Sequence, residues 1–405
     1  MSPPPMTPSP AGTPAAIPSR YMNLDAARRV HGPRVDELAP YLLRGDRLAD
    51  AALEALMRLP PSLRARTLDA ALERGNEENV GAPIEVRNLV EQIETVPNWV
   101  DWRKINEAGA VYRRCGMTGG MLLGCCGLPL IYASPCANKT LVFSGRLVHR
   151  APRRLSETAR FVVASCRPDG MKPHNPGWKI TVKVRVNMHA QMRRRLMTTP
   201  SWNHAVWGLP VNQLDMIGTN LRFSFGLLDH MRSVGFRFSK DEGEAVMMLW
   251  RYSGYLLGIE PELLCATEDA GRRTAHLLDT TDMPPDQDSV KLTRALMETA
   301  LPRLLQPDRD FPPGKMPWIS RYFYGLSHAI IGRRHSEALE YPRTLWRYTA
   351  RLSTAAAVSA FELLRLYMPG GRAFAERFGT WTVDSAISSN PAAKAAKFDI
   401  GDDHE

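Results

Sequence analysis

The side chains best suited to chemistry lie around His189, in a stretch whose apolar residues recur at helical spacing. Residues three and four positions apart share one face of a helix, so Arg185 and Arg193 lie one turn before and one turn after His189. A neutral imidazole on an apolar face can bind iron, and guanidinium groups can pair with the carboxylates of a haem. A core histidine that hydrogen-bonds a backbone carbonyl fits the same pattern, so this helix alone leaves both interpretations open.

The elements that must position His189 are helices, because strand patterns are scarce and no hairpin pattern around Asn-Gly or Asp-Gly occurs. Ser239 followed by Glu242 is a capping box that predicts a helix start, and Gly235 is suited to end the helix before it. Apolar residues recur at helical spacing over residues 46–59, 62–74, 98–114, 215–233, 286–305, 319–331 and 345–367, the last being the expected final helix. We therefore predict an all-α protein.

The domain organisation follows from length and composition. The chain has 405 residues, of which 44% are hydrophobic, enough for one large domain with a substantial core. Residues 1–20 are rich in Pro, Ser, Thr and Ala and lack the basic and apolar regions of a secretory signal, which predicts a disordered arm. We expect one all-α domain over residues 21–385 and a flexible polar tail over residues 386–405.

The net charge of +10 is spread along the chain and forms no basic stripe, so it does not favour nucleic-acid binding. The six cysteines show neither CxxC nor CxxCH spacing, which excludes covalent c-type haem attachment and fits buried, reduced thiols in a cytoplasmic protein. Residues 119–136 approach the length of a membrane span. Their Gly and Pro residues favour a bent helix inside protein, so we expect no stable span.

An ordered series of motifs covers about residues 95–270. The series consists of Pro97-Asn-Trp-Val-Asp-Trp102, Arg153-Arg-Leu-Ser-Glu-Thr158, Val184-Arg-Val-Asn-Met-His-Ala190, Arg193, Pro210-Val-Asn-Gln-Leu-Asp215 and Gly254-Tyr-Leu-Leu-Gly-Ile259. In this order the motifs resemble those of the bacterial latex clearing proteins, and of the wider family that includes the fungal mycophenolic-acid-pathway oxygenase.

The resemblance implies a globin-like helical core with additional surrounding helices and a non-covalently bound haem b. It implies that His189 is the proximal iron ligand and that Arg154, Thr158 and Arg193 lie around the haem. Thr219 corresponds to a further threonine of the pocket. The best-known activity of the family is O2-dependent cleavage of the double bonds of polyisoprene.

Two positions depart from the rubber-cleaving members of the family. Glu157 stands where those members have a lysine that can approach the iron, and Asn138 is the residue nearest by counting to their upstream glutamate. We therefore expect a haem-b oxygenase that uses O2 on a small apolar, unsaturated isoprenoid or lipid, and that cleaves polyisoprene poorly. The expected catalytic residues are Glu157, Thr158 and Thr219, and the expected cofactor-binding residues are His189, Arg154, Arg185 and Arg193.

Two alternatives come from other functional classes. One is a haem-binding sensor or storage protein without turnover, and the other is a basic helical nucleic-acid-binding protein without a cofactor. A Soret band in the purified protein would separate the last alternative from the others. The segment from Met121 to Leu130 and the residues Met188, Met192, Met247 and Met248 are candidates for lining a hydrophobic access pocket.

Overall fold

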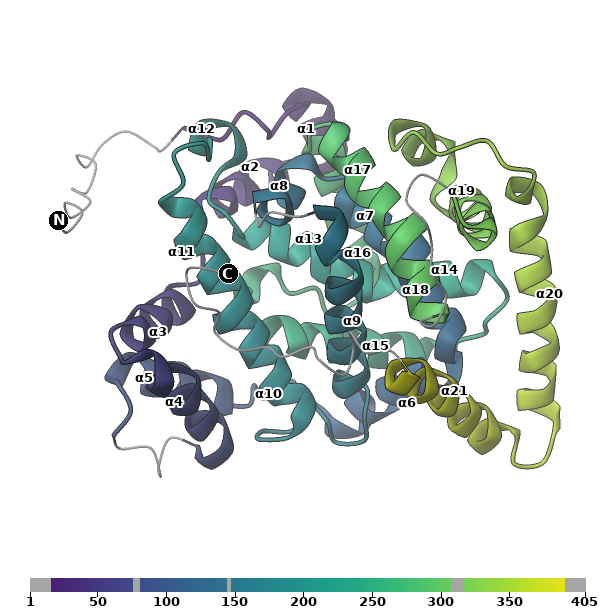
Figure 1. Cartoon of the computed structure of the whole chain (residues 1–405), viewed down its shortest axis with the longest axis horizontal. Coiled ribbons are helices and arrows are strands. Elements are labelled where there is room, and N and C mark those ends of the chain that lie inside the picture. The colour runs from purple at the N-terminus through teal and green to yellow at the C-terminus, as the bar shows by residue number, and fades with distance from the viewer. Residues whose placement is uncertain (1–15, 76–80, 144–146, 307–315, 390–405) are drawn as a thin grey trace.

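The computed structural model describes residues 16–75, 81–143, 147–306 and 316–389, and every regular element in those ranges is a helix (Figure 1). The predicted all-α fold is confirmed. Buried side chains form a large apolar core around the long helices α6 (Trp102–Leu122) and α15 (Lys240–Leu256). A smaller core lies among α1 (Leu24–His31), α2 (Arg34–Leu38) and α13 (Gln213–Phe223).

The N-terminal helices form a subassembly at one side of the molecule, at the lower left of Figure 1. It consists of α3 (Arg47–Met57), α4 (Pro61–Arg74) and α5 (Ile84–Glu94), of which the first two match predicted segments. Asp46 caps α3 by accepting a hydrogen bond from the amide of Ala49 at 3.1 Å. α3 also contacts the segment that carries His189, so it supports the candidate site.

The central helix α6 bends at Gly116 (φ +50°) and then continues through the π-helical segment η2 (Leu123–Gly127) into α7 (Leu128–Tyr132). A positive φ suits glycine because it has no Cβ to clash with the backbone. Residues Trp102–Tyr132 are long and apolar enough to cross a membrane, but 61% of their most apolar window is buried inside the protein. The bent, buried helix expected from the Gly and Pro content of this region is therefore present.

Two antiparallel helical segments carry the motif residues. α8 (Pro135–Phe143) leads to α9 (Leu147–Ser165), and the chain then turns back into α10 (Pro176–Lys183), η3 (Val184–Ala190) and α11 (Gln191–Met197). These last three form one continuous helix with a π-helical centre. α9 packs against α10 but makes few contacts with η3, so the two segments diverge away from their connecting loop (Figure 1).

The predicted helix over residues 215–233 is two helices. After the short helix α12 (His204–Trp207), α13 ends at Phe223 and α14 (Phe225–Ser233) begins at a new angle, because Ser224 (ψ −110°) leaves the helical conformation. The capping box of Ser239 and Glu242 is confirmed at the start of α15, where the Ser239 hydroxyl accepts from the Glu242 amide at 3.1 Å. α16 (Glu268–Thr281) completes this region.

The C-terminal part contains one helix more than expected. α17 (Gln287–Ala295), the π-helical segment η5 (Leu296–Ala300) and α18 (Leu301–Leu305) are followed by α19 (Trp318–Ala338) and α20 (Trp346–Tyr367). The prediction that α20 is the final helix is wrong. Pro369 and Gly370 form a turn, and α21 (Gly371–Ser389) then packs across α6.

The expected boundaries of the domain differ from the described structure at both ends. Residues 1–15 of the predicted arm and residues 390–405 of the predicted tail lie outside the described residues. Arg20, placed in the arm, is buried and forms ion pairs with Asp215 at 2.8 Å and Asp282 at 3.2 Å. Residues 386–389, placed in the tail, belong to α21. The packed structure therefore extends beyond residues 21–385 on both sides.

Candidate functional site

The imidazole of His189 lies deep in the fold, while part of its surface remains accessible. Nδ1 is fully buried and has no hydrogen-bonding partner in the described part of the chain. The carbonyl hydrogen bond that would mark an ordinary core histidine is thus absent at this nitrogen. Leaving a buried polar atom unsatisfied costs about 1–3 kcal/mol, so the position is unusual for a histidine that only fills the core.

The surroundings of His189 keep the imidazole neutral. Burial, followed by the positive charges of Arg193 and Arg185, lowers its pKa from 6.5 to about 4, although the carboxylate of Asp46 acts in the opposite direction. A neutral imidazole has a free lone pair and is the form that binds iron. The arginines expected beside His189 therefore have an electrostatic effect on it, whatever else they bind.

Arg185 is held in the protein interior by its own partners. Its guanidinium donates to Asp46 Oδ2 at 2.6 Å, to Asp46 Oδ1 at 3.0 Å and to Gln92 Oε1 at 2.7 Å. Gly258 makes room for this pair, because a Cβ there would come within 2.1 Å of the Asp46 carboxylate. The pair fixes η3 against α3. All three guanidinium nitrogens of Arg185 donate hydrogen bonds to partners inside the protein.

Arg193 anchors the other end of η3. It donates to Asp50 Oδ1 at 2.7 Å and to the carbonyl of Val211 at 3.0 Å. Gln213 completes the connection by donating to the carbonyls of Gly45 at 2.9 Å and Gly258 at 2.8 Å. The motif residues Arg185, Arg193, Gln213 and Gly258 thus form a buried polar scaffold that orients the helix of His189.

The N-terminal half of α9 carries three further predicted site residues. α9 runs antiparallel to α10 and η3, and Arg154, Glu157 and Thr158 lie on the part of α9 that diverges from η3. Arg154 donates to the carbonyl of Leu141 at 3.0 Å. Glu157 accepts from Arg153 Nε at 2.9 Å, so its carboxylate is paired with an arginine one turn away on the same helix.

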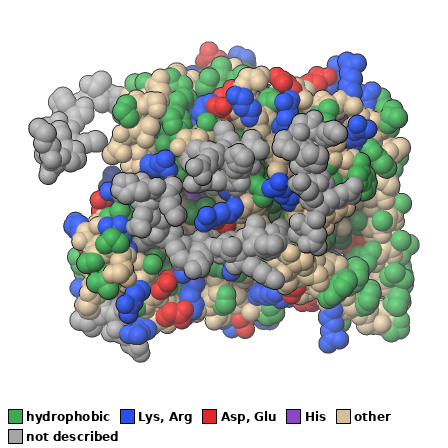
Figure 2. All heavy atoms as spheres, viewed as in Figure 1, with side chains coloured by type: hydrophobic (Ala, Val, Ile, Leu, Met, Phe, Trp, Pro, Cys, Tyr) green, Lys and Arg blue, Asp and Glu red, His purple; other side chains and the backbone are tan. Residues whose placement is uncertain are grey.

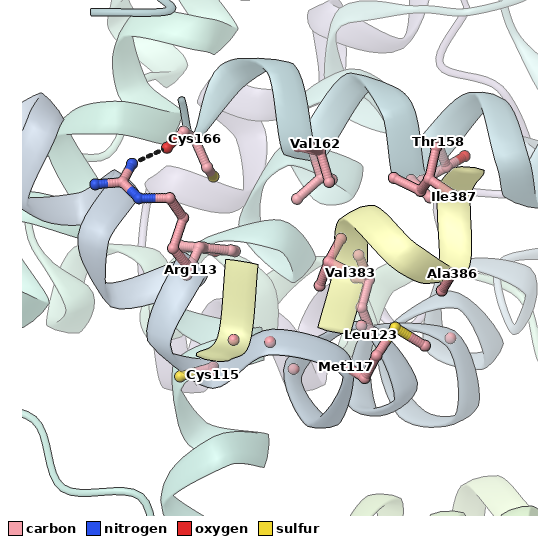
Figure 3. Close-up of a pocket in the computed structure, with 18 of the residues that line it drawn as sticks. Arg113, Cys115, Met117, Leu123, Thr158, Val162, Cys166, Val383, Ala386 and Ile387 are labelled. Carbon is pink, nitrogen blue, oxygen red and sulfur yellow. Dashed lines mark hydrogen bonds between the residues drawn. The ribbon is translucent and has the colours of Figure 1, made fainter. Parts of the chain in front are cut away.

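Thr158 lies in a different environment from His189. It lines an apolar cavity of about 110 Å³ between α6, α9 and α21 (Figure 3). Val162 follows it on the same face of α9 and Cys166 lies just after the end of that helix, with Met117 and Leu123 on the opposite wall. Within the described residues, Thr158 is the only predicted catalytic residue at this cavity, and His189 is not among the residues that line it.

Thr219 is not among the residues that line the cavity beside Thr158. It lines a second pocket, of about 70 Å³, together with Arg20, Asp215 and Asp282. Asn138, at the position compared with the family glutamate, is buried and donates to the carbonyl of Tyr132 and to Ser289 Oγ, each at 2.8 Å. The structure therefore does not bring Thr219 or Asn138 together with the other predicted site residues.

Two features of the site were not predicted from the sequence. His189 lies in a π-helical segment, a local widening of the helix that often occurs at functional sites, and no residue pattern predicted it. The cavity takes Leu123, Gly124 and Leu128 from the expected apolar segment, but none of the four methionines proposed for it. The methionines that do line the cavity are Met117 and Met231, which lie on two helices that the sequence analysis did not bring together.

Comparison with known proteins identifies the family. Residues 112–362 match the family described as the catalytic domain of the ER-bound oxygenases mpaB/B' and rubber oxygenase. The chain belongs to this family. The family expected from the motifs is therefore confirmed.

Individual relatives agree with the family. The chain is 26% identical over 202 residues to rubber oxygenase from Streptomyces sp. (strain K30), and the match covers 49% of each chain. The chain thus spans about half the length of this curated relative. A solved structure of latex clearing protein in its closed state has a similar fold, with a TM-score of 0.66, 20% identity, and coverage of 89% of this chain and 95% of that one.

Proposed function

We propose that this chain is a haem-b oxygenase that uses O2 on a small apolar, unsaturated isoprenoid or lipid. The observation that carries the proposal is the imidazole of His189, which is neutral, buried and without a partner at Nδ1. One imidazole is the protein ligand that a haem iron requires, since the porphyrin supplies four more nitrogens. The family to which the chain belongs supports the oxygenase class.

The residues of the chain would divide the work as follows. His189 would hold the iron, and Arg154, on the facing helix, would pair with a haem carboxylate. Burial, with the charges of Arg193 and Arg185, keeps the imidazole neutral. The two arginines also fix its helix by binding Asp50 and Asp46, where contacts with the haem propionates were first expected. When bound, haem b supplies an iron that can bind and activate O2. The apolar cavity beside Thr158 would hold the hydrocarbon substrate and exclude water.

The test of the iron ligand compares two buried histidines. Both His189 and His230 lie in the interior with a pKa of about 4 and an unpaired Nδ1, so they differ mainly in position. His189→Ala should yield a folded protein with little Soret absorbance, while His230→Ala should retain haem. Full haem occupancy in His189→Ala would reject the assignment, and haem loss only in His230→Ala would move the ligand to α14.

The test of turnover uses the haem-loaded protein with O2. Incubation with a short unsaturated isoprenoid should give carbonyl-ended products, and incubation with polyisoprene latex should give little. Abundant products from latex would show that Glu157 does not prevent rubber cleavage. Stable haem binding without product from any unsaturated substrate would favour the sensor or storage protein.

A further inference from the structure

α20 has two apolar faces, although it packs against the protein with only one of them. Ala350, Thr354 and Val358 are buried against the rest of the fold. On the opposite side, Leu352 is 69% exposed and Tyr367 is 77% exposed. A continuous row of exposed apolar side chains is uncommon on a soluble surface and marks an interaction site.

α21 packs against α20 and carries a second group of exposed apolar side chains. Phe374, Phe378 and Trp381 are exposed. Phe374 stacks on Phe378 with ring centroids 5.8 Å apart, and Trp381 lies tilted against Phe378 at 6.0 Å. In Figure 2, hydrophobic side chains gather along the edge of the molecule formed by α20. We call this surface the aromatic edge and define it by Tyr348, Leu352, Leu363 and Tyr367 of α20 with the three aromatic residues of α21.

The free charges beside the aromatic edge are all positive. Arg347, Arg351, Arg372 and Arg377 form no ion pair with an acidic side chain of the described residues. The acidic residues of the two helices are each neutralised by an arginine: Glu362 by Arg365 at 2.7 Å, Glu376 by Arg113 at 2.6 Å and Asp384 by Arg167 at 2.6 Å. The edge therefore presents apolar surface flanked by guanidinium groups whose charge no carboxylate of the described residues neutralises.

We propose that the aromatic edge docks onto an anionic lipid surface. Exposed Trp, Tyr and Phe side chains insert into the boundary between headgroups and acyl chains, while arginines bind the phosphates of anionic lipids. A second copy of this chain fits the edge less well, because pairing two such edges would place arginines against arginines. The proposal concerns a surface, and it does not rest on the proposed oxygenase function.

The position of α21 gives the docking a consequence. Its inner face, including Gly379, Val383 and Ile387, forms one wall of the apolar cavity (Figure 3). Its outer face carries Phe378 and Trp381. A helix with its side chains is about 10 Å across. Docking through the aromatic edge would therefore hold the cavity within about one helix diameter of the lipid. An apolar molecule would then have only a short path from the lipid to the cavity.

Flotation with vesicles tests the proposal without haem or turnover. The full chain should float with phosphatidylcholine vesicles that contain phosphatidylglycerol, and much less with phosphatidylcholine alone. Tyr348→Ser/Leu352→Ser/Tyr367→Ser should abolish flotation. The matched control, Val30→Ser/Leu63→Ser/Ile84→Ser, removes exposed apolar residues from α1, α4 and α5 and should float like the unmodified chain.

The contribution of charge is tested in the same way. Arg372→Gln/Arg377→Gln should weaken binding to the anionic vesicles roughly 30-fold, at about fivefold for each basic side chain near an anionic surface. Arg47→Gln/Arg66→Gln, on exposed arginines of α3 and α4, is the control with the same loss of net charge. Equal weakening by both pairs would mean that only net charge matters, and would overturn the docking surface.

Size-exclusion chromatography with light scattering completes the test. If the unmodified chain is a dimer that the triple serine substitution converts to a monomer, and neither protein floats, the edge is an interface between copies and the lipid proposal is wrong. A monomer that fails to float with anionic vesicles also rejects it. Because all substituted side chains are exposed, the variants should remain folded. Circular dichroism checks that their helix content equals that of the unmodified chain.

Discussion

The side chains around His189 differ in how strongly they tie η3 to the rest of the fold. Asp46 and Arg185 form a buried pair with side-chain exposures of 5% and 2%. Burial acts to raise the pKa of Asp46, but the charge and hydrogen bonds of Arg185 outweigh it and hold this pKa below its ordinary value. The carboxylate is therefore ionised in the folded protein, and Arg185 depends on it.

Asp46→Asn should lower the free energy of unfolding by roughly 3 kcal/mol, because it leaves a buried guanidinium without its counter-charge. Asp50→Asn is the matched control. It removes the partner of Arg193, but the Asp50 side chain is 40% exposed, so the expected loss is about 1 kcal/mol. Urea unfolding of the two variants measures the difference. Equal losses would contradict the structural importance assigned to the Asp46–Arg185 pair.

Glu157 is the residue at which this chain departs most clearly from the lysine-bearing members of its family. Its carboxylate is nearly buried and paired with Arg153. A carboxylate near iron disfavours an anionic oxygen ligand, whereas a lysine can approach the iron itself. Glu157→Lys should therefore shift the Soret band and electron paramagnetic resonance signals of the haem-loaded protein. Glu157→Gln, which cannot supply an amine, should leave the spectra closer to those of the unmodified chain. Identical spectra for all three proteins would place Glu157 outside the haem environment.

At the scale of elements, α6 and α21 approach each other through glycines. A Cβ on Gly379 would come within 2.0 Å of the carbonyl oxygen of Arg113, and a Cβ on Gly116 within 2.8 Å of Gly379 Cα. Gly379→Ala should therefore push α21 away from α6, lowering the free energy of unfolding by about 1–3 kcal/mol. Gly120→Ala, on α6 with no neighbouring atom within 4 Å, should be neutral or stabilising by up to about 1 kcal/mol. Thermal unfolding distinguishes the two variants. If they have the same effect, the close crossing is not important for stability.

The sequence predicted elements well where a local signal determines them. The Ser239 capping box and the amphipathic patterns of α3 and α20 gave the correct helices, because capping and apolar spacing act within a few residues. The break at Ser224 and the π-helical widening around His189 depend on packing between distant elements, so they left no local pattern. The apolar cavity was missed for the same reason: α21, which forms one of its walls, was not expected as a helix.

The candidate site shows the same division. The types and order of motif residues predicted the family, and His189 was singled out by its apolar helical face. The spacing of the motif residues did not show which of them support the helix of His189 and which face the ligand. Arg185 and Arg193 satisfy the pattern expected for haem carboxylates, but in the fold they bind Asp46 and Asp50. The position of an arginine in the sequence is the same whether its guanidinium binds a carboxylate of the protein or one of a haem.

For the molecule as a whole, buried histidines make stability depend on pH. Burial, with a smaller contribution from Arg222, lowers the pKa of His230 from 6.5 to about 4. The unfolded chain therefore takes up a proton at this position as the pH falls below 6.5, while the folded chain stays neutral until about pH 4. The contribution of the neutral His230 to stability is present in full above pH 6.5 and is lost progressively below it.

His230→Gln tests this dependence directly. Between about pH 7.5 and pH 5, the unmodified chain should lose roughly 2 kcal/mol of unfolding free energy through His230, at 1.36 kcal/mol for each pH unit below 6.5. The variant should lose less over the same range by about that amount. His204→Gln, at an exposed position, should keep the slope of the unmodified chain. Urea unfolding at the two pH values measures all three slopes. Carboxylates that begin to titrate near pH 5 affect the three proteins alike, so their contribution cancels in the comparison. A slope for His230→Gln equal to that of the unmodified chain would show that His230 is already protonated, or has found a partner, in the folded protein.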